Sequence, residues 1–187
     1  MIRVMFDSDN PADLPRGAMG ATYSDLFVSA AELARLRGEF PAGLLLIDRH
    51  GDPLGQAVIL DVETGLHKPS DAPGWFDRRM AEGATGLTIY CNRSNLAAVT
   101  AAMGDRGWFR WVATLDGTAH IAGFPPGLAP AAVQILGEAK LGFHADMSVV
   151  WEPGWHSAEG WRAASRREAL DIAAAAAELA VLLGAHQ

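Results

Sequence analysis

Cysteine and lysine are scarce in this chain of 187 residues. Cys91 is the only cysteine, so neither an intrachain disulfide nor a cysteine-based zinc site can form. The only lysines are Lys68 and Lys140, and 22 acidic residues outnumber 15 basic ones, which gives a formal net charge of −7. Because a duplex binder needs a basic face, this composition argues against nucleic acid as the main partner.

Long apolar stretches are also missing. Residues 1–7 lack the extended hydrophobic region and the small-residue cleavage site of a signal peptide, so we expect synthesis in the cytoplasm without one. The uncharged stretches near the carboxyl end are far shorter than the roughly 20 residues of a bilayer span. We therefore predict no membrane span, and work outside the cell would need another delivery route.

Several familiar site patterns are absent as well. The six histidines show no ligand spacing, and no Gly-x-Ser-x-Gly elbow or glycine-rich phosphate loop is present. The segment 7–13 superficially resembles a calcium loop but lacks its glycine and its bidentate glutamate, since Ala18 stands at the twelfth position. We predict no cofactor and no dedicated metal site, and only weak binding of a divalent ion among acids at strand ends stays open.

Apolar runs that end in a polar residue alternate with helix-forming segments, in a chain that is 50% hydrophobic. The predicted strands are 2–6, 21–27, 43–48, 57–62, 86–90, 110–115, 120–122, 131–135 and 146–151, and the predicted helices are 30–37, 73–82 and 95–103. This alternation is typical of a parallel α/β fold, and about eight strands favour a barrel. A complete barrel of this type usually needs about 250 residues, so some helices must be short or missing, notably after the fifth strand. We predict a compact, irregular TIM-like barrel.

The carboxyl-terminal part differs in kind. Residues 157–185 are rich in helix formers and carry a broad apolar surface that Asp171 and Glu178 interrupt. We predict a long helix that packs either on the barrel or on another subunit or virion component. The predicted domains are therefore a barrel over 1–153 and a helical extension over 154–187.

Two acids follow the fourth predicted strand directly. Asp61 and Glu63 are two residues apart, and alternation along a strand puts both side chains on one face, with Cα atoms about 6.5–7 Å apart. Glycosidases use such a carboxylate pair, one as general acid and the other as nucleophile or base. The alternative is a solvated strand end beside a helix N-cap.

Acids also stand at other strand exits. Because the loops after parallel barrel strands open on one face, Asp7, Asp61, Glu63 and Asp146 are expected to converge there. Their mutual repulsion predicts that at least one holds its proton near neutral pH, as a general acid requires. For Asp25 and Asp48, we favour the role of exposed turn residues.

Short motifs in this order resemble glycoside hydrolase family 25, the lysozyme-type muramidases. The matching pieces are Met5-Phe-Asp7, Leu60-Asp-Val-Glu63, Ile89-Tyr-Cys-Asn92, Trp111-Val-Ala113, Val133-Gln134 and Ala145-Asp-Met-Ser148. The chain is most similar to small family 25-like proteins of actinobacterial phages and prophages, which open with Phe-Asp-Ser-x-Asn-Pro and carry Ala-Pro-Gly-Trp, here at 72–75. The resemblance covers about residues 2–151.

The resemblance implies a catalytic role for each of the converging acids. Glu63 would be the general acid that protonates the glycosidic oxygen. Asp61 would stabilise positive charge at the anomeric carbon or orient the N-acetyl group of the substrate. Asp7 and Asp146 would flank the pair and tune its protonation.

The resemblance also implies a substrate groove. Tyr23, Tyr90 and Gln134 would contact the glycan, and Trp111 would offer a stacking face for a sugar ring. The sequence departs from the family pattern at Leu115, where the family tends to have an aromatic residue, and at Ile135, where a tyrosine is common. Both differences remove aromatic rings from the groove.

Two functional hypotheses follow. The first is a retaining muramidase that hydrolyses β-1,4 bonds of peptidoglycan at the cell wall. The second is a barrel without catalysis that serves as a structural or glycan-binding component of a phage particle or cell surface. The complete set of acids favours the enzyme, whereas the missing groove aromatics favour the structural component.

Overall fold

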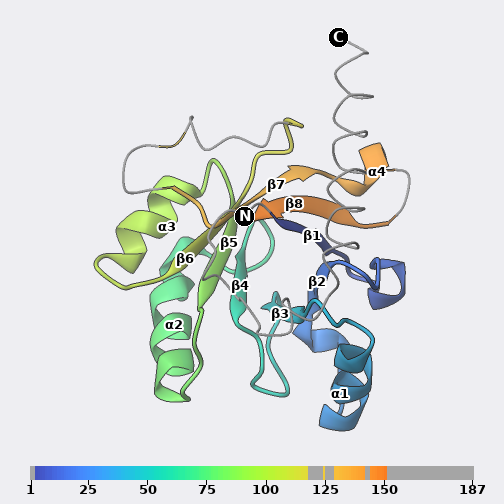
Figure 1. The fold of residues 1–187 in the computed structure, drawn as a ribbon. Coiled ribbons are helices and arrows are strands. Elements are labelled where there is room, and N and C mark those ends of the chain that lie inside the picture. Colours follow the sequence, from blue (N-terminus) through green and yellow to red (C-terminus); the bar gives the residue numbers. More distant parts are fainter. Residues whose placement is uncertain (1–2, 118–123, 125–128, 142–143, 151–187) are drawn as a thin grey trace.

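Eight strands form a closed barrel in the order of the sequence (Figure 1). The computed structural model describes residues 3–117, 124, 129–141 and 144–150. The strands are β1 (Arg3–Asp7), β2 (Met19–Tyr23), β3 (Leu44–Asp48), β4 (Ile59–Val62), β5 (Thr88–Asn92), β6 (Phe109–Ala113), β7 (Ala132–Leu136) and β8 (Asp146–Val150). The α-helices are α1 (Ala30–Gly38), α2 (Ala72–Ala81), α3 (Leu96–Met103) and α4 (Glu138–Leu141), and the 3-10 helices are η1 (Pro11–Asp13), η2 (Ser24–Leu26) and η3 (Pro69–Asp71). The predicted α/β barrel is confirmed.

The barrel is mixed and not wholly parallel, which corrects the sequence-based expectation. Strands β1 to β7 are parallel to their neighbours, but β8 runs antiparallel to both β7 and β1. Only nine residues separate β7 from β8, and they include the short helix α4. A parallel connection needs a crossover of a dozen or more residues, so this short link reverses the chain direction.

Side chains alternate between the barrel interior and an outer layer under the helices. From β4, Ile59 joins the interior cluster with Met5 and Trp111, whereas Leu60 and Val62 join an outer cluster. That outer cluster contains Trp75 and Phe76 of α2 and Val99 and Met103 of α3. The alternation puts Asp61 on the interior side, as the period of two along a strand predicts.

The three helices expected from the sequence are confirmed within one residue at each end. Ser29 begins α1, and its hydroxyl accepts a hydrogen bond from the Glu32 amide. Pro73 stands in the first turn of α2, where its missing amide hydrogen costs no hydrogen bond. The expectation that a helix is short or missing after the fifth strand is wrong, because α3 follows β5. A helix is missing instead between β3 and β4, where residues 49–58 are all described and hold none.

The second strand begins and ends earlier than predicted. It covers Met19–Tyr23, and the next residues form the 3-10 turn η2. The Ser24 hydroxyl lies 3.1 Å from the carbonyl oxygens of both Ile47 and Gly51, and the Phe27 amide bonds back to the Ser24 carbonyl. These bonds turn the chain away from the sheet.

Some predictions fall outside the described residues. These are the strand over 120–122, the long helix over 157–185 and thus the proposed extension over 154–187. Among the helices that the structure does describe, none has the length and apolar character needed to cross a bilayer.

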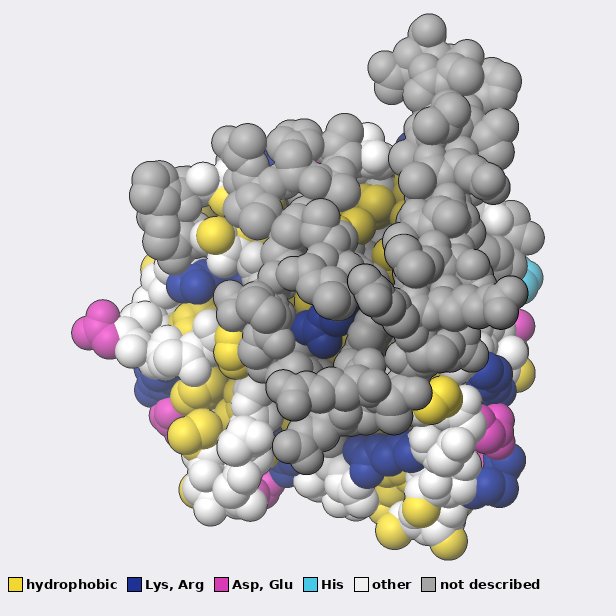
Figure 2. Space-filling model, viewed as in Figure 1, with side chains coloured by type: hydrophobic (Ala, Val, Ile, Leu, Met, Phe, Trp, Pro, Cys, Tyr) yellow, Lys and Arg dark blue, Asp and Glu magenta, His cyan; other side chains and the backbone are white. Residues whose placement is uncertain are grey.

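Where described side chains are visible in Figure 2, basic groups lie beside acidic and apolar ones. Around α1, for example, Arg16 and Arg35 both form ion pairs with Glu39, at 3.3 and 2.7 Å. Ion pairs of this exposed kind contribute little to stability.

Asp48 is buried and not an exposed turn residue, which is a second correction. It is 3% exposed, and its carboxylate accepts hydrogen bonds from Trp75 Nε1 at 3.0 Å and from the Gly51 amide at 2.7 Å. It therefore ties the end of β3 to α2. Asp25 is partly buried and pairs with Arg49.

Replacing Asp48 by alanine is expected to lower the free energy of unfolding by about 3 kcal/mol, because the buried Trp75 indole and the partly buried Gly51 amide both lose their acceptor. The measurement is urea denaturation of the full chain. Asp25→Ala is the matched control, with an expected loss of about 1 kcal/mol or less. Equal losses in both variants would contradict the structural role given to Asp48.

Candidate functional site

Asp7, Asp61, Glu63 and Asp146 converge at one end of the barrel. Asp7 is the last residue of β1, Asp61 lies in β4 and Glu63 follows that strand. Asp146 is the first residue of β8, and because β8 is antiparallel, it pairs in register with Asp7. The sequence-based prediction that these acids meet is thus supported by the arrangement of the strands.

Burial and repulsion between neighbouring charges raise the pKa values of these carboxyl groups. Burial raises the pKa of Asp7 well above its ordinary value, and the charges of Asp146, Asp61 and Glu63 raise it further. Burial also raises the pKa of Asp61 to about 8, with a further contribution from Glu63 and an opposing one from Arg49. The pKa of Asp146 is raised too, mainly by burial. At neutral pH, Asp61 is therefore mostly protonated.

Two carboxyl oxygens in this group have no hydrogen-bond partner among the described residues. They are Oδ1 of Asp7 and Oδ1 of Asp61, both inaccessible to solvent. As whole residues, Asp7 is 8% exposed and Asp61 is 1% exposed. Leaving buried polar atoms unpaired costs free energy, and natural proteins tolerate it mainly where the group serves a function.

A chain of hydrogen bonds connects Glu63 to Asp146 across the barrel. The Tyr90 hydroxyl contacts the Glu63 carboxyl group and also donates to Oε1 of Gln134. Nε2 of Gln134 donates to Oδ2 of Asp146, whose other oxygen accepts the Glu138 amide at 2.8 Å. The chain therefore crosses from β4 through β5 and β7 to β8.

The direction of this chain determines where one proton lies. Because the Gln134 amide nitrogen faces Asp146, its oxygen must face Tyr90, and the single hydroxyl hydrogen of Tyr90 can point to that oxygen. That hydrogen can be donated either to Gln134 or to Glu63, and only the bond to Glu63 would favour its ionised carboxylate.

Three influences act on the pKa of Glu63. Burial raises it, a hydrogen bond donated by Tyr90 lowers it, and the charge of Asp146 raises it again. The lowering bond competes with the bond from Tyr90 to Gln134, because the hydroxyl has one hydrogen. With that hydrogen on Gln134, burial and Asp146 remain, and Glu63 keeps its proton to higher pH.

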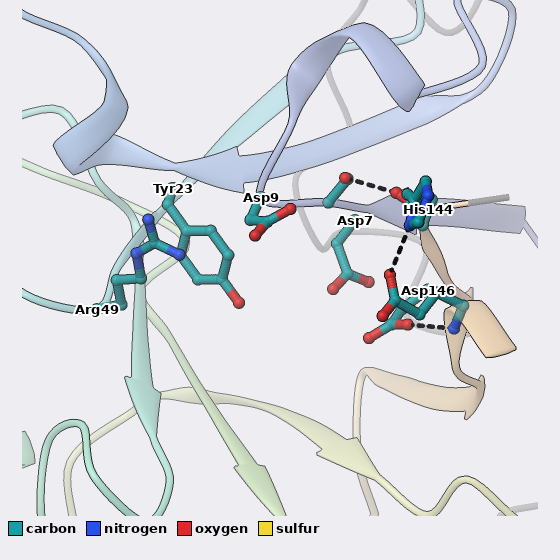
Figure 3. Close-up of a pocket in the computed structure, with 9 residues that line it drawn as sticks. Asp7, Asp9, Tyr23, Arg49, His144 and Asp146 are labelled. Carbon is teal, nitrogen blue, oxygen red and sulfur yellow. Dashed lines mark hydrogen bonds and ion pairs between the residues drawn. The ribbon is translucent and has the colours of Figure 1, made fainter.

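A cavity of about 240 Å³ opens beside Asp7 and Asp146. Figure 3 shows the guanidinium of Arg49 next to the Tyr23 ring on one side, Asp7 and Asp9 between, and Asp146 with His144 on the other side. Ser8 fixes the rim, because its hydroxyl donates to the His144 carbonyl oxygen at 2.6 Å.

Six lining residues were not predicted as site residues from the sequence: Ser8, Asp9, Arg49, Glu138, His144 and Ala145. A signal existed for Arg49, because it stands two residues after the interior residue Ile47. For the others no signal existed, since they come from loops and from the short helix α4, which was not predicted.

Three of the four predicted glycan-contacting residues lie at the site. Tyr23 lines the cavity, and Tyr90 and Gln134 belong to the hydrogen-bond chain. Burial raises the pKa of both tyrosines, with neighbouring acids adding to it, so both stay neutral hydrogen-bonding groups.

Trp111 does not offer a stacking face, contrary to the prediction. It is fully buried, its Nε1 donates to the Ser148 hydroxyl at 2.9 Å, and its ring packs edge-on against Tyr90 at 4.7 Å between centroids. Trp111 points from β6 into the barrel interior, where its ring packs against Tyr90. Within the described residues, no group of three or more His, Cys, Asp or Glu side chains is arranged to hold a metal ion.

The raised pKa of Asp61 predicts a cost in stability that grows with pH. A folded state that retains this proton binds more protons than the unfolded chain, whose aspartates ionise near pH 4, so stability falls as pH rises toward 8. We expect Asp61→Asn to raise the free energy of unfolding by about 2–4 kcal/mol at pH 7 and by almost nothing at pH 4. Urea denaturation at both values measures this.

The control for that experiment is Asp105→Asn, at an exposed turn position after α3. It should change stability by about 0.5 kcal/mol or less at either pH. A stabilisation by Asp61→Asn that did not depend on pH would argue against a protonated Asp61.

Gln134→Leu is expected to lower the pKa of Glu63. Without the amide oxygen, the Tyr90 hydroxyl turns its hydrogen to Glu63 and stabilises the ionised carboxylate. The carboxyl carbon of Glu63 reports this by NMR titration of selectively labelled protein. Tyr90→Phe, which removes the donor, should not lower that pKa, and a fall of equal size in both variants would refute the direction of the chain.

Comparison with known proteins gives no family for this chain. No family model matches the sequence, no curated protein matches it significantly, and no solved structure matches it significantly.

Proposed function

We propose that this protein is a glycoside hydrolase that cleaves β-1,4 bonds of peptidoglycan, as a muramidase of the family 25 type from a phage or prophage. The observation that carries the proposal is the buried group of Asp7, Asp61, Glu63 and Asp146 at the barrel mouth, in which burial raises the pKa of each carboxyl group. The family resemblance of the motifs supports the same reaction.

The geometry supports a division of roles between the two acids of the pair. Glu63 is only half-buried and follows its strand, so it can reach a substrate and donate its proton to the glycosidic oxygen. Asp61 is almost fully buried beneath it. To stabilise the positive charge that develops at the anomeric carbon, Asp61 must first release its proton to solvent, and its pKa of about 8 lets a fraction of the molecules do so at neutral pH.

Asp7 and Asp146 act on the pair through charge and hydrogen bonding. Asp7 is the more buried of the two, and its proton removes a negative charge that would oppose ionisation of Asp61. Asp146 holds Gln134, which in turn directs the Tyr90 hydrogen away from Glu63. These two acids are positioning residues in the proposal.

The direct test is release of reducing sugar from purified peptidoglycan of actinobacterial and other walls. Glu63→Gln should reduce the rate by a factor of about 10²–10⁴, because a glutamine of nearly the same shape has no proton to donate. Glu32→Gln is the matched control, since that side chain is exposed in the first turn of α1 and does not line the cavity. Its activity should stay close to that of the unmodified protein.

The second proposal is a barrel without catalysis, serving as a structural or glycan-binding component of a phage particle or cell surface. One observation favours it: Trp111 is buried, and the ring of Tyr23 is covered by Arg49 at 4.1 Å. Among the described cavity residues, little aromatic surface is therefore exposed for a sugar ring to stack on. A folded protein that releases no sugar from any wall, with or without Glu63, would favour this second function.

A further inference from the structure

Among the described residues that line the cavity, Arg49 is the only arginine or lysine. It follows β3 directly, two residues after Ile47, whose side chain is in the barrel interior. The alternation of the strand thus aims Arg49 into the barrel mouth. The opposite wall is acidic, with Asp146 on the far side of the cavity in Figure 3.

The guanidinium of Arg49 is held in a fixed orientation by two contacts. Nε lies 3.1 Å from both carboxylate oxygens of Asp25, and the guanidinium carbon lies 4.1 Å from the centroid of the Tyr23 ring. Its side chain is 22% exposed. An arginine that is already ordered loses little conformational entropy when it binds a ligand.

The terminal nitrogens of Arg49 remain for a ligand. In the part of the chain that the structure describes, Arg49 forms its hydrogen bonds through Nε alone. Two parallel N–H groups of a guanidinium match the two oxygens of a carboxylate. The side chain therefore presents a planar donor pair to the cavity next to the acids.

The nearby acids do not prevent an anion from binding at this position. Burial raises the pKa of Asp61 to about 8 and that of Asp7 well above its ordinary value, so both carboxyl groups resist ionisation. Asp146 lies across the cavity from Arg49, and Asp9 lies between them (Figure 3). A ligand with an anionic group at one end and neutral hydroxyl or acetamido groups at the other is complementary to this distribution of charge.

We propose that Arg49 binds a carboxylate carried by a sugar of the substrate, so that the site selects acidic glycans over uncharged ones. This inference rests on the proposed glycosidase function. In peptidoglycan the carboxylate is the lactyl group of the muramic sugar once its peptide has been removed. The site would then act on glycan strands whose peptides an amidase has already released.

The test measures binding by calorimetry in a Glu63→Gln background, so that no ligand is hydrolysed. Three tetrasaccharides are compared: an alternating N-acetylglucosamine and N-acetylmuramic acid chain with free carboxylates, its methyl ester, and an N-acetylglucosamine chain. The first should bind about tenfold or more tightly than the other two, as expected for a hydrogen bond to a charged group. The preference should weaken with added salt.

Arg49→Met should abolish this preference. The matched control is Arg16→Met, because Arg16 also combines an ion pair, with Glu39 at 3.3 Å, and a stacking contact, with Phe40 at 4.5 Å, but lies outside the cavity. The control should keep the preference.

Three results would overturn the inference. They are equal binding of the acid and its ester, a preference that survives Arg49→Met, and an absence of binding by all three chains. The reducing-sugar assay with the unmodified protein is independent of these results. Hydrolysis without a carboxylate preference would retain the proposed function and reject the role of Arg49. A carboxylate preference without hydrolysis would retain carboxylate binding by Arg49 and reject the proposed hydrolase activity.

Discussion

The burial of Asp7 beside Asp146, at the seam where β1 meets β8, is the constraint on which the site depends. The two residues pair in register, and the charge of Asp146 adds to burial in raising the pKa of Asp7. Because a buried charge is costly, the pKa values of these carboxyl groups are raised. The same effect of burial and of neighbouring acids raises the pKa of Asp61 and of Glu63. A surface position for any of these acids would remove that coupling.

The reversed direction of β8 is what places Asp146 beside Asp7. Antiparallel β8 brings its first residue, and not its last, to the end of the barrel where the parallel strands finish. The same reversal lets Gln134 on β7 donate to Asp146 and receive the Tyr90 hydrogen. Below this chain, buried Trp111 packs on Tyr90 and fixes its position. The barrel thus supports a directed line of hydrogen bonds and not only a cluster of acids.

The sequence predicted the barrel class and the converging acids because both depend on local patterns. The period of two in β4 puts Asp61 and Glu63 on one side, and apolar runs that end in acids mark the strand exits. It did not predict the direction of β8, which depends on the length of the link after β7. It also misjudged Asp48 and Trp111, since the same residue types occur in turns and in grooves. Their roles depend on partners far along the chain, Trp75 for Asp48 and Ser148 for Trp111.

The central claim is that the Tyr90 hydrogen lies on Gln134 and not on Glu63, so that Glu63 keeps its proton to higher pH. Neutron diffraction from deuterated crystals at neutral pD tests it most directly, because it shows each deuteron by position. The account predicts a deuteron on the Glu63 carboxyl group directed to the Tyr90 oxygen, and the Tyr90 deuteron directed to Gln134. A bare Glu63 carboxylate that receives the Tyr90 deuteron would contradict it.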